Sequence, residues 1–164
     1  ANMYYSTYYG QTGPYTNIFS NYMLSYYTND PWGEITREGR DDHYVFRGQN
    51  TEPLKLEDVF VPGADIRALL KKAFEANALG SEGDWVPNNY ATTKEQRNGY
   101  FDAVLDYGLD FTIGSDRLYF YINEGAADLF IHQNIGEGLN QYALRNLISY
   151  AMYKDLGMDN LSIF

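Results

Sequence analysis

The chain has 164 residues, no cysteine, and a formal net charge of −10 from 22 acidic and 12 basic residues. Because the few Lys and Arg are scattered, the composition argues against a nucleic acid or an anionic membrane surface as a partner. Seventeen tyrosines and nine phenylalanines favour strands over a helix bundle. A chain of this length can bury a core without disulfides, and we expect a single domain spanning residues 1–164.

The acidity of the chain has two interpretations. It suits a cationic partner, and it also keeps a domain soluble without any partner. No apolar run approaches the about 20 residues that a membrane-spanning helix needs, so we expect no membrane span within this chain.

The tyrosine-rich stretch MYYSTYYGQTGPY begins at residue 3. Residues 3–9 and 18–27 are rich in β-forming residues on either side of a Gly-Pro turn, which predicts a β-hairpin. Side chains alternate between the two faces of a strand, so one face receives Tyr4 and Tyr8 and the other receives Tyr5 and Tyr9. One of these pairs must be either exposed or covered by another element, and it marks a place where a partner could bind.

Residues 28–42 contain a proline, two glycines and many charges, which predicts an exposed loop. A short strand over 43–46 and a turn over 48–53 follow. Together with the tyrosines, the loop supplies candidate binding residues for the rim of a site, namely Asp30, Trp32, Glu34, Asp41 and Asp42.

Apolar residues recur at helical spacing from Ile66 onward, with Gly63 before them, and predict a helix over residues 64–77. We expect Leu69 and Phe74 to lie deep in the core. The sheet and this helix together predict an α+β fold, in which an antiparallel sheet has one main helix packed across it and one or two further short helices.

A second helix is expected over residues 93–105, with Thr92 and Glu95 spaced as a capping box and Gly108 at its end. Alternating apolar residues around Gly-Ser-Asp predict a β-hairpin over 109–123, and residues 129–133 read as one more strand. The last segment is ambiguous, because its periodicity prefers a helix whereas a strand followed by a short helix also fits.

No catalytic motif stands out. His43 follows Asp41 and Asp42, but no Gly-x-Ser-x-Gly or Ser-x-x-Lys motif supplies a nucleophile. The acidic loop lacks the alternating spacing of a calcium loop, and no His pair has the spacing of a zinc site. Acid pairs such as Asp106 and Asp110 occur by chance in any acidic chain. We therefore expect a non-catalytic domain with no metal and no cofactor.

Three blocks of sequence carry a family resemblance. They are TEPLKLEDVFVPGADIRALLKKAF from residue 51, LDFTIGSDRLYFYINEGAADLF from residue 109, and LISYAMYKDL from residue 147. Over residues 18–164 the chain resembles the RsiV-like domain family, the C-terminal domain of lysozyme-sensing anti-sigma factors, which also occurs in some peptidoglycan deacetylases. The Gly-Gly-Ala-His segment that this family usually carries in its first hairpin is missing here, so its role does not transfer.

The resemblance implies an α+β domain that lies outside the cytoplasm at the bacterial cell envelope and that binds or senses without catalysing. It also favours a strand followed by a short helix at the end of the chain. The first hypothesis is a domain that recognises a cationic protein such as a lysozyme-like wall-active enzyme. Alternatives are an accessory module that binds peptidoglycan or another cell-wall glycan, a catalyst of unrecognised type, and a structural envelope domain.

Overall fold

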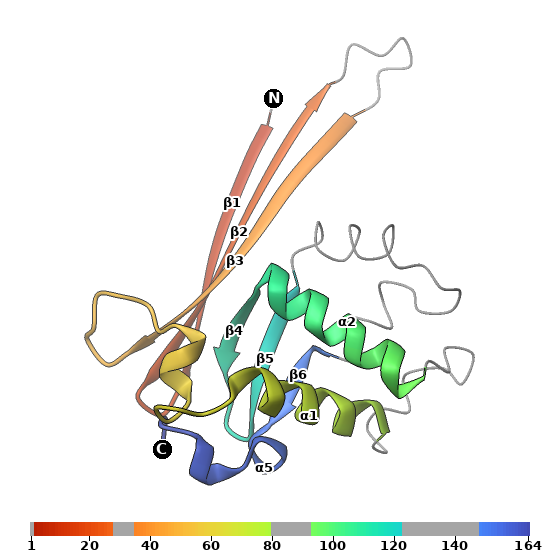
Figure 1. Cartoon of the computed structure of the whole chain (residues 1–164). Coiled ribbons are helices and arrows are strands. Elements are labelled where there is room, and N and C mark those ends of the chain that lie inside the picture. Colours follow the sequence, from red (N-terminus) through yellow and green to blue (C-terminus); the bar gives the residue numbers. More distant parts are fainter. Residues whose placement is uncertain (1, 28–34, 80–92, 123–147) are drawn as a thin grey trace. The chain divides into compact units, whose positions relative to one another are not determined.

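The computed structural model describes residues 2–27, 35–79, 93–122 and 148–164. Contacts divide the chain into two compact units, Ala1–Pro53 and Leu54–Phe164. Each unit contains a three-stranded antiparallel sheet, and the second unit adds the helices (Figure 1). The predicted α+β class is therefore confirmed, whereas the single domain stays a prediction.

The first unit is a sheet of long strands in the order β1-β2-β3. Strands β1 (Asn2–Thr12) and β2 (Tyr15–Tyr27) form the predicted hairpin. Both strands extend closer to the turn than expected. Gly13 at this turn has a φ of 54°, a value that glycine adopts at little steric cost. The turn lets the two strands pair without interruption from Thr12 and Tyr15 outward.

The third strand corrects the prediction for residues 28–42. Strand β3 (Ile35–Arg47) already begins at residue 35 and pairs with β2 along its whole length, so residues 35–42 are strand and not loop. Charged residues suit a strand that has a neighbour on one side only, because such an edge must resist unwanted pairing. The remainder of the predicted loop, residues 28–34, lies outside the described residues.

The second unit has a sheet in the order β4-β5-β6, with helices beside it. Helices α1 (Ile66–Leu79) and α2 (Lys94–Tyr107) lie side by side (Figure 1). Both are 14 residues long, so α2 is not shorter than the predicted main helix. The remaining elements, in chain order, are η1 (Leu56–Val59), β4 (Leu109–Ile113), β5 (Arg117–Ile122), β6 (Tyr150–Met152), α5 (Tyr153–Leu156) and η4 (Met158–Asn160).

Helix α1 supplies the centre of the core in the second unit. Leu70, Ala73 and Phe74 are completely buried, as the helical spacing of the apolar residues predicts. Leu69, which we expected to lie equally deep, is only half-buried because it stands at the edge of this apolar stripe. Asn77 is buried as well, and its side-chain amide donates a hydrogen bond to the backbone carbonyl of Tyr150 in β6.

The end of the chain is tied to the segment before α1. Phe60 and Leu161 form an antiparallel bridge, and the Val61 amide donates to the carbonyl of Asn160 over 2.9 Å. Val59 and Phe60 are buried, so the block that opens the predicted helix contributes to the same core. Leu56 of the same stretch is only partly buried, so the end of LEDVF faces the core.

Helix α2 begins one residue later than the predicted cap. Its N-cap is Thr93, whose hydroxyl accepts a hydrogen bond from the Gln96 amide over 3.1 Å, while the Gln96 side chain accepts one from the Thr93 amide. The predicted capping box of Thr92 and Glu95 is wrong by one residue, since the box is formed by Thr93 and Gln96. Glutamine can take the place of glutamate at the third helical position of a capping box. Gly108 ends the helix with a φ of 105°, as expected.

The predicted hairpin at 109–123 is confirmed by the pairing of β4 with β5. At the end of the chain, β6 is followed directly by α5, so the strand-then-helix alternative is confirmed for residues 150–156 against the helical periodicity. The predicted strand at 129–133 lies outside the described residues.

Candidate binding surface

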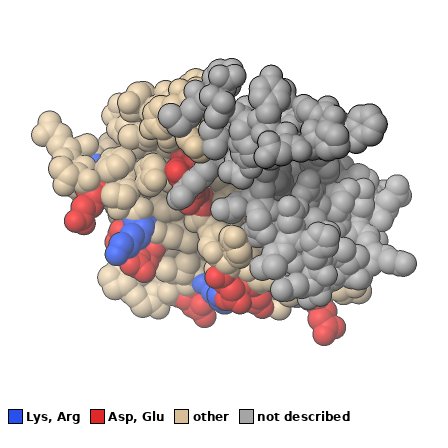
Figure 2. All heavy atoms as spheres, turned by 90° about the horizontal axis from the view of Figure 1, so that it is seen from above, with Lys and Arg blue, Asp and Glu red and all other residues tan. Residues whose placement is uncertain are grey.

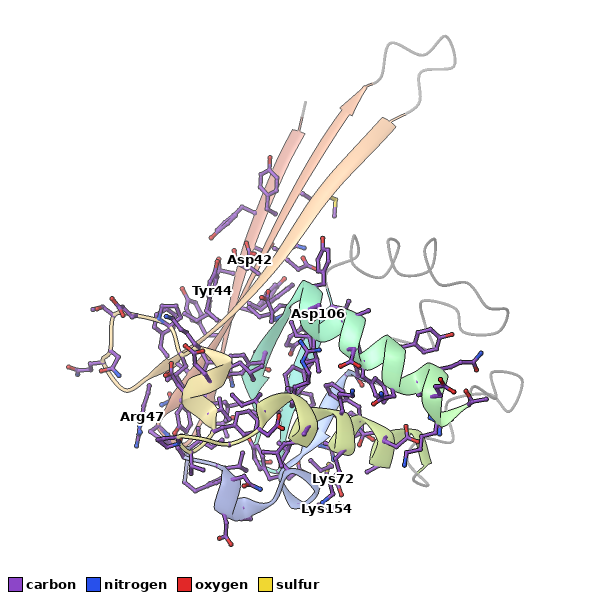
Figure 3. The ribbon with its side chains drawn as sticks, in the orientation of Figure 1. Asp42, Tyr44, Arg47, Lys72, Asp106 and Lys154 are labelled. Carbon is purple, nitrogen blue, oxygen red and sulfur yellow. The ribbon has the colours of Figure 1, made fainter. Side chains whose placement is uncertain are left out.

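One face of the first sheet carries a group of exposed tyrosines. Tyr5 and Tyr9 of β1 and Tyr44 of β3 are 69%, 74% and 40% exposed. The register places Tyr9, Ile18 and Tyr44 in one row across the three strands, and Tyr5 lies opposite Tyr22 in a second row. Cross-strand neighbours share a face, so we call Tyr5, Tyr9, Tyr22 and Tyr44 the tyrosine face (Figure 3 labels Tyr44).

Polar groups lie between the two rows of the tyrosine face. Thr7, Ser20 and Asp42 form the row between them, one residue from each strand. The Ser20 hydroxyl donates to the Tyr5 hydroxyl oxygen over 3.1 Å. This hydrogen bond, with a smaller contribution from Thr7, holds the pKa of Tyr5 below its ordinary value, because it stabilises the phenolate. Tyr5 is therefore joined to the polar row of the same face.

The opposite face of the same sheet carries a row of rings. Tyr8 stacks on Phe19 with ring centroids 5.7 Å apart, and Phe19 contacts the His43 ring at 4.8 Å. Tyr8 is nevertheless 61% exposed. The predicted alternation of Tyr5 and Tyr9 against Tyr8 is confirmed, and both faces of β1 display tyrosine to solvent.

The two aspartates predicted for a loop rim lie within β3 and point to opposite faces. Asp42, which is labelled in Figure 3, lies on the tyrosine face. The register pairs it with Ser20 of β2. Asp41 lies on the other face, where its carboxylate accepts a hydrogen bond from the Asn21 side-chain amide. Only Asp42 of this pair can therefore contribute charge beside the exposed tyrosines.

Of the other residues predicted for the site, Asp30, Trp32 and Glu34 lie outside the described residues. Tyr4 lies in β1, opposite Met23, and nothing further is described of its side chain. Sequence reasoning missed Tyr44, because only the register between β2 and β3 brings it beside Tyr9. Its position two residues after Asp42 in a strand was the one available signal, since such neighbours share a face.

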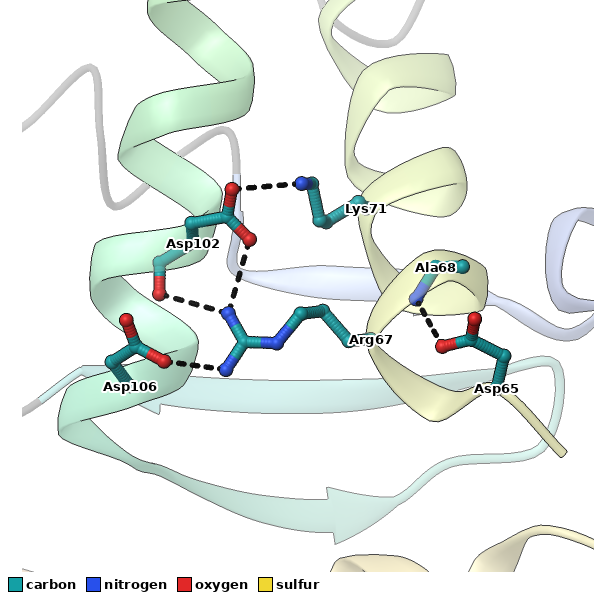
Figure 4. Close-up of polar contacts among 6 residues, drawn as sticks. All are labelled: Asp65, Arg67, Ala68, Lys71, Asp102 and Asp106. Carbon is teal, nitrogen blue, oxygen red and sulfur yellow. Dashed lines mark hydrogen bonds and ion pairs between the residues drawn. The ribbon is translucent and has the colours of Figure 1, made fainter. Parts of the chain in front are cut away.

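A groove lies in the other unit, between helices α1 and α2. This groove has a volume of about 510 Å³ and is lined by charged side chains that include Arg67, Lys71 and Glu75. Arg67 binds Asp102 over 3.0 Å and also Asp106, while Lys71 binds the second Asp102 oxygen over 2.9 Å (Figure 4).

At the other end of the helix pair, Arg97 of α2 binds both carboxylate oxygens of Glu75, over 2.9 and 2.6 Å. The charges along the groove thus join one helix to the other. On the face drawn in Figure 2, Lys and Arg likewise reach the surface beside Asp or Glu. Asp106, one of the acidic residues considered for catalysis, is engaged in this ion-pair network.

Two findings bear on metals and membranes. Within the part of the chain that the structure describes, no three His, Cys, Asp or Glu side chains gather as metal ligands would. None of the described helices has the length and apolar character required to cross a membrane.

Comparisons with protein-family models, curated proteins and solved structures found no match. The resemblance to the RsiV-like family therefore stays a prediction. The tyrosine face is the strongest candidate site, because its aromatic side chains are exposed, whereas Arg67, Lys71 and Glu75 of the groove are engaged in ion pairs.

Proposed function

We propose that this chain is a non-catalytic binding domain of the cell envelope that recognises a cationic protein through the tyrosine face. The observation that carries the proposal is the exposure of Tyr5, Tyr9 and Tyr44 on one side of a single sheet. Tyrosine is enriched in protein interfaces, since its ring contributes contact area and its hydroxyl a hydrogen bond at a small entropic cost.

Charge supports a cationic partner. The chain carries a formal net charge of −10, and Asp42 lies on the tyrosine face itself. Complementary charge raises the association rate, whereas buried aromatic anchors mainly slow dissociation. A lysozyme-like basic protein fits this chemistry and also the family resemblance.

The test measures the binding kinetics of the 164-residue chain to a basic lysozyme and to a neutral protein of similar size. We expect binding to the basic protein alone, with an association rate that falls as salt is raised, because salt screens the attraction. The double variant Tyr9→Ala/Tyr44→Ala should weaken binding at least about tenfold, mainly through faster dissociation.

Tyr107→Ala is the matched control, since Tyr107 is 49% exposed at the end of α2, in the other unit. It should leave binding unchanged. Equal binding to both proteins, or no binding to either, would contradict the proposal.

A glycan-binding module is the second candidate, because exposed aromatic rings also stack on sugars. Its arm of the test is purified peptidoglycan. Retention of the chain on peptidoglycan that is lost in Tyr9→Ala/Tyr44→Ala but insensitive to salt would favour this second function.

A further inference from the structure

The two outer strands of the first sheet differ sharply in charge. Among the described residues, β1 pairs only with β2, and β3 likewise pairs only with β2, so each leaves one backbone edge without a strand beside it. Such edges present amide and carbonyl groups that can pair with another strand.

Strand β3 carries the charges that usually protect an edge. Six of its 13 residues are charged, namely Arg37, Glu38, Arg40, Asp41, Asp42 and Arg47. Strand β1 has none of these safeguards, because its 11 residues, NMYYSTYYGQT, include no Asp, Glu, Lys, Arg or Pro. A long edge that is uncharged and free of proline favours the addition of a further strand.

We propose that the β1 edge binds the β1 edge of a second copy of this chain, so that two three-stranded sheets join into one continuous antiparallel sheet. An uncharged edge meets another uncharged edge without leaving any charge unpaired, whereas β3 of a second copy would bring six charged residues to the contact. Two-fold symmetry is the commonest symmetry of homodimers, and it makes the joined strands antiparallel.

The tyrosines of β1 fit such a pairing. In a two-fold register centred on Thr7, Tyr5 of one copy lies opposite Tyr9 of the other, and the reverse pair repeats on the far side of the axis. Aromatic residues that face each other across antiparallel strands stabilise the pair. Both tyrosines are exposed in the single chain, at 69% and 74%, so the contact would cover them in part.

Charge gives this self-association its own signature. Each chain carries a formal net charge of −10, so two copies repel one another at long range. Raising salt screens the repulsion and should strengthen the dimer. Salt should have the opposite effect on binding to a cationic protein, which it should weaken. The dimer and the binding of a cationic protein can therefore fail independently, and the two failures can be told apart.

Sedimentation of the 164-residue chain over a wide range of concentration tests the proposal. We expect a monomer–dimer equilibrium that shifts to dimer with added salt. Thr7→Lys places a lysine on the edge strand and should raise the dimer dissociation constant at least about tenfold, since like charges would meet across the axis.

Thr16→Lys is the matched control, because Thr16 is also a half-buried threonine on the tyrosine face but belongs to the central strand β2. It should leave the dimer intact. Monomer at every concentration, a dimer that Thr7→Lys does not weaken, or equal weakening by both variants would overturn the proposal.

A cross-linking experiment covers the case in which Thr7→Lys fails to fold. The chain contains no cysteine, so a single introduced cysteine has no partner within the same molecule. Thr7→Cys should form a disulfide between two copies on mild oxidation, whereas Thr16→Cys should not, because cross-strand neighbours at the axis approach closely enough for this bond. Equal cross-linking of both variants, or of neither, would contradict pairing centred on Thr7.

Discussion

Phe74 of α1 meets Phe120 of β5 edge to face, with ring centroids 5.6 Å apart and ring planes at 85°. Phe74 also contacts Phe101 of α2 at 5.5 Å. One side chain therefore joins both helices to the sheet of the second unit. Edge-to-face aromatic pairs add a specific attraction to the burial of apolar area.

Replacing Phe74 by alanine should lower the free energy of unfolding of the second unit by about 3–5 kcal/mol, because the change leaves a cavity among packed rings. Urea denaturation followed by circular dichroism measures this loss. Met158→Ala is the control, since Met158 is 53% exposed and should change stability little. A similar loss in both variants would show that Phe74 does not hold the core.

Asn77 provides a separate test of how α1 is attached to β6. Its buried amide donates to the backbone carbonyl of Tyr150. Asn77→Ala removes the donor and leaves that carbonyl without it, which should cost about 1–3 kcal/mol. Hydrogen exchange should show faster exchange in β6 of the variant. Unchanged exchange there would mean that the hydrogen bond does not secure the strand.

The sequence alone predicts the elements whose signals are local. Apolar spacing identifies α1, the Gly-Ser-Asp turn identifies the β4–β5 hairpin, and Gly108 marks the end of α2. The local sequence of residues 35–42 predicts a loop, whereas these residues form part of β3, because the strand depends on pairing with β2, a segment distant in the chain.

The candidate site was predictable only in part, for the same reason. Alternation along β1 correctly separates Tyr5 and Tyr9 from Tyr8. The register between β2 and β3 places Tyr44 and Asp42 on the same face as Tyr5 and Tyr9, and places Asp41 on the other face. A prediction that treats residues 35–42 as a loop cannot assign these side chains to a face. Charge composition alone does not reveal which carboxylates are already engaged, as Asp102 is by Lys71 and Arg67.

The ion pairs between the helices predict a response to acid. Hydrogen bonds from Lys71, and then from Arg67, hold the pKa of Asp102 below its ordinary value of 3.8. A carboxylate with a lowered pKa contributes stability above its unfolded-state pKa and loses that contribution as pH falls through the folded-state pKa. Because the Asp102 side chain is 38% exposed, the contribution should be no more than about 1 kcal/mol.

We therefore expect the stability of Asp102→Asn to approach that of the native chain as pH falls below about 4, after being lower at neutral pH. Thermal melts at several pH values measure the difference. The same change at Asp159, an exposed aspartate in η4, is the control and should show a smaller difference at neutral pH. A deficit in Asp102→Asn that does not depend on pH would contradict the assignment.

Two glycines of the second unit should respond oppositely to alanine. At Gly114, in the turn between β4 and β5, an added Cβ would lie 2.6 Å from the Tyr119 ring and 2.8 Å from the Arg117 carbonyl oxygen. At Gly99, within α2, nothing lies within 4 Å of an added Cβ. Gly114→Ala should lower the free energy of unfolding by about 1–3 kcal/mol. The Gly114 amide donates a hydrogen bond to the same carbonyl over 2.8 Å, so the backbone cannot move away from it without disturbing the turn.

Gly99→Ala should instead raise the free energy of unfolding by about 0.5–1 kcal/mol, because alanine loses less conformational freedom than glycine when a helix forms. Urea denaturation of both variants beside the native chain gives the two signs in one experiment. Stabilisation by Gly114→Ala would mean that the turn is looser than its 2.8 Å hydrogen bond indicates. An alanine side chain that contacts nothing changes the helix only through its higher helix propensity. A loss of stability in Gly99→Ala would therefore mean that the added methyl group clashes with another part of the protein.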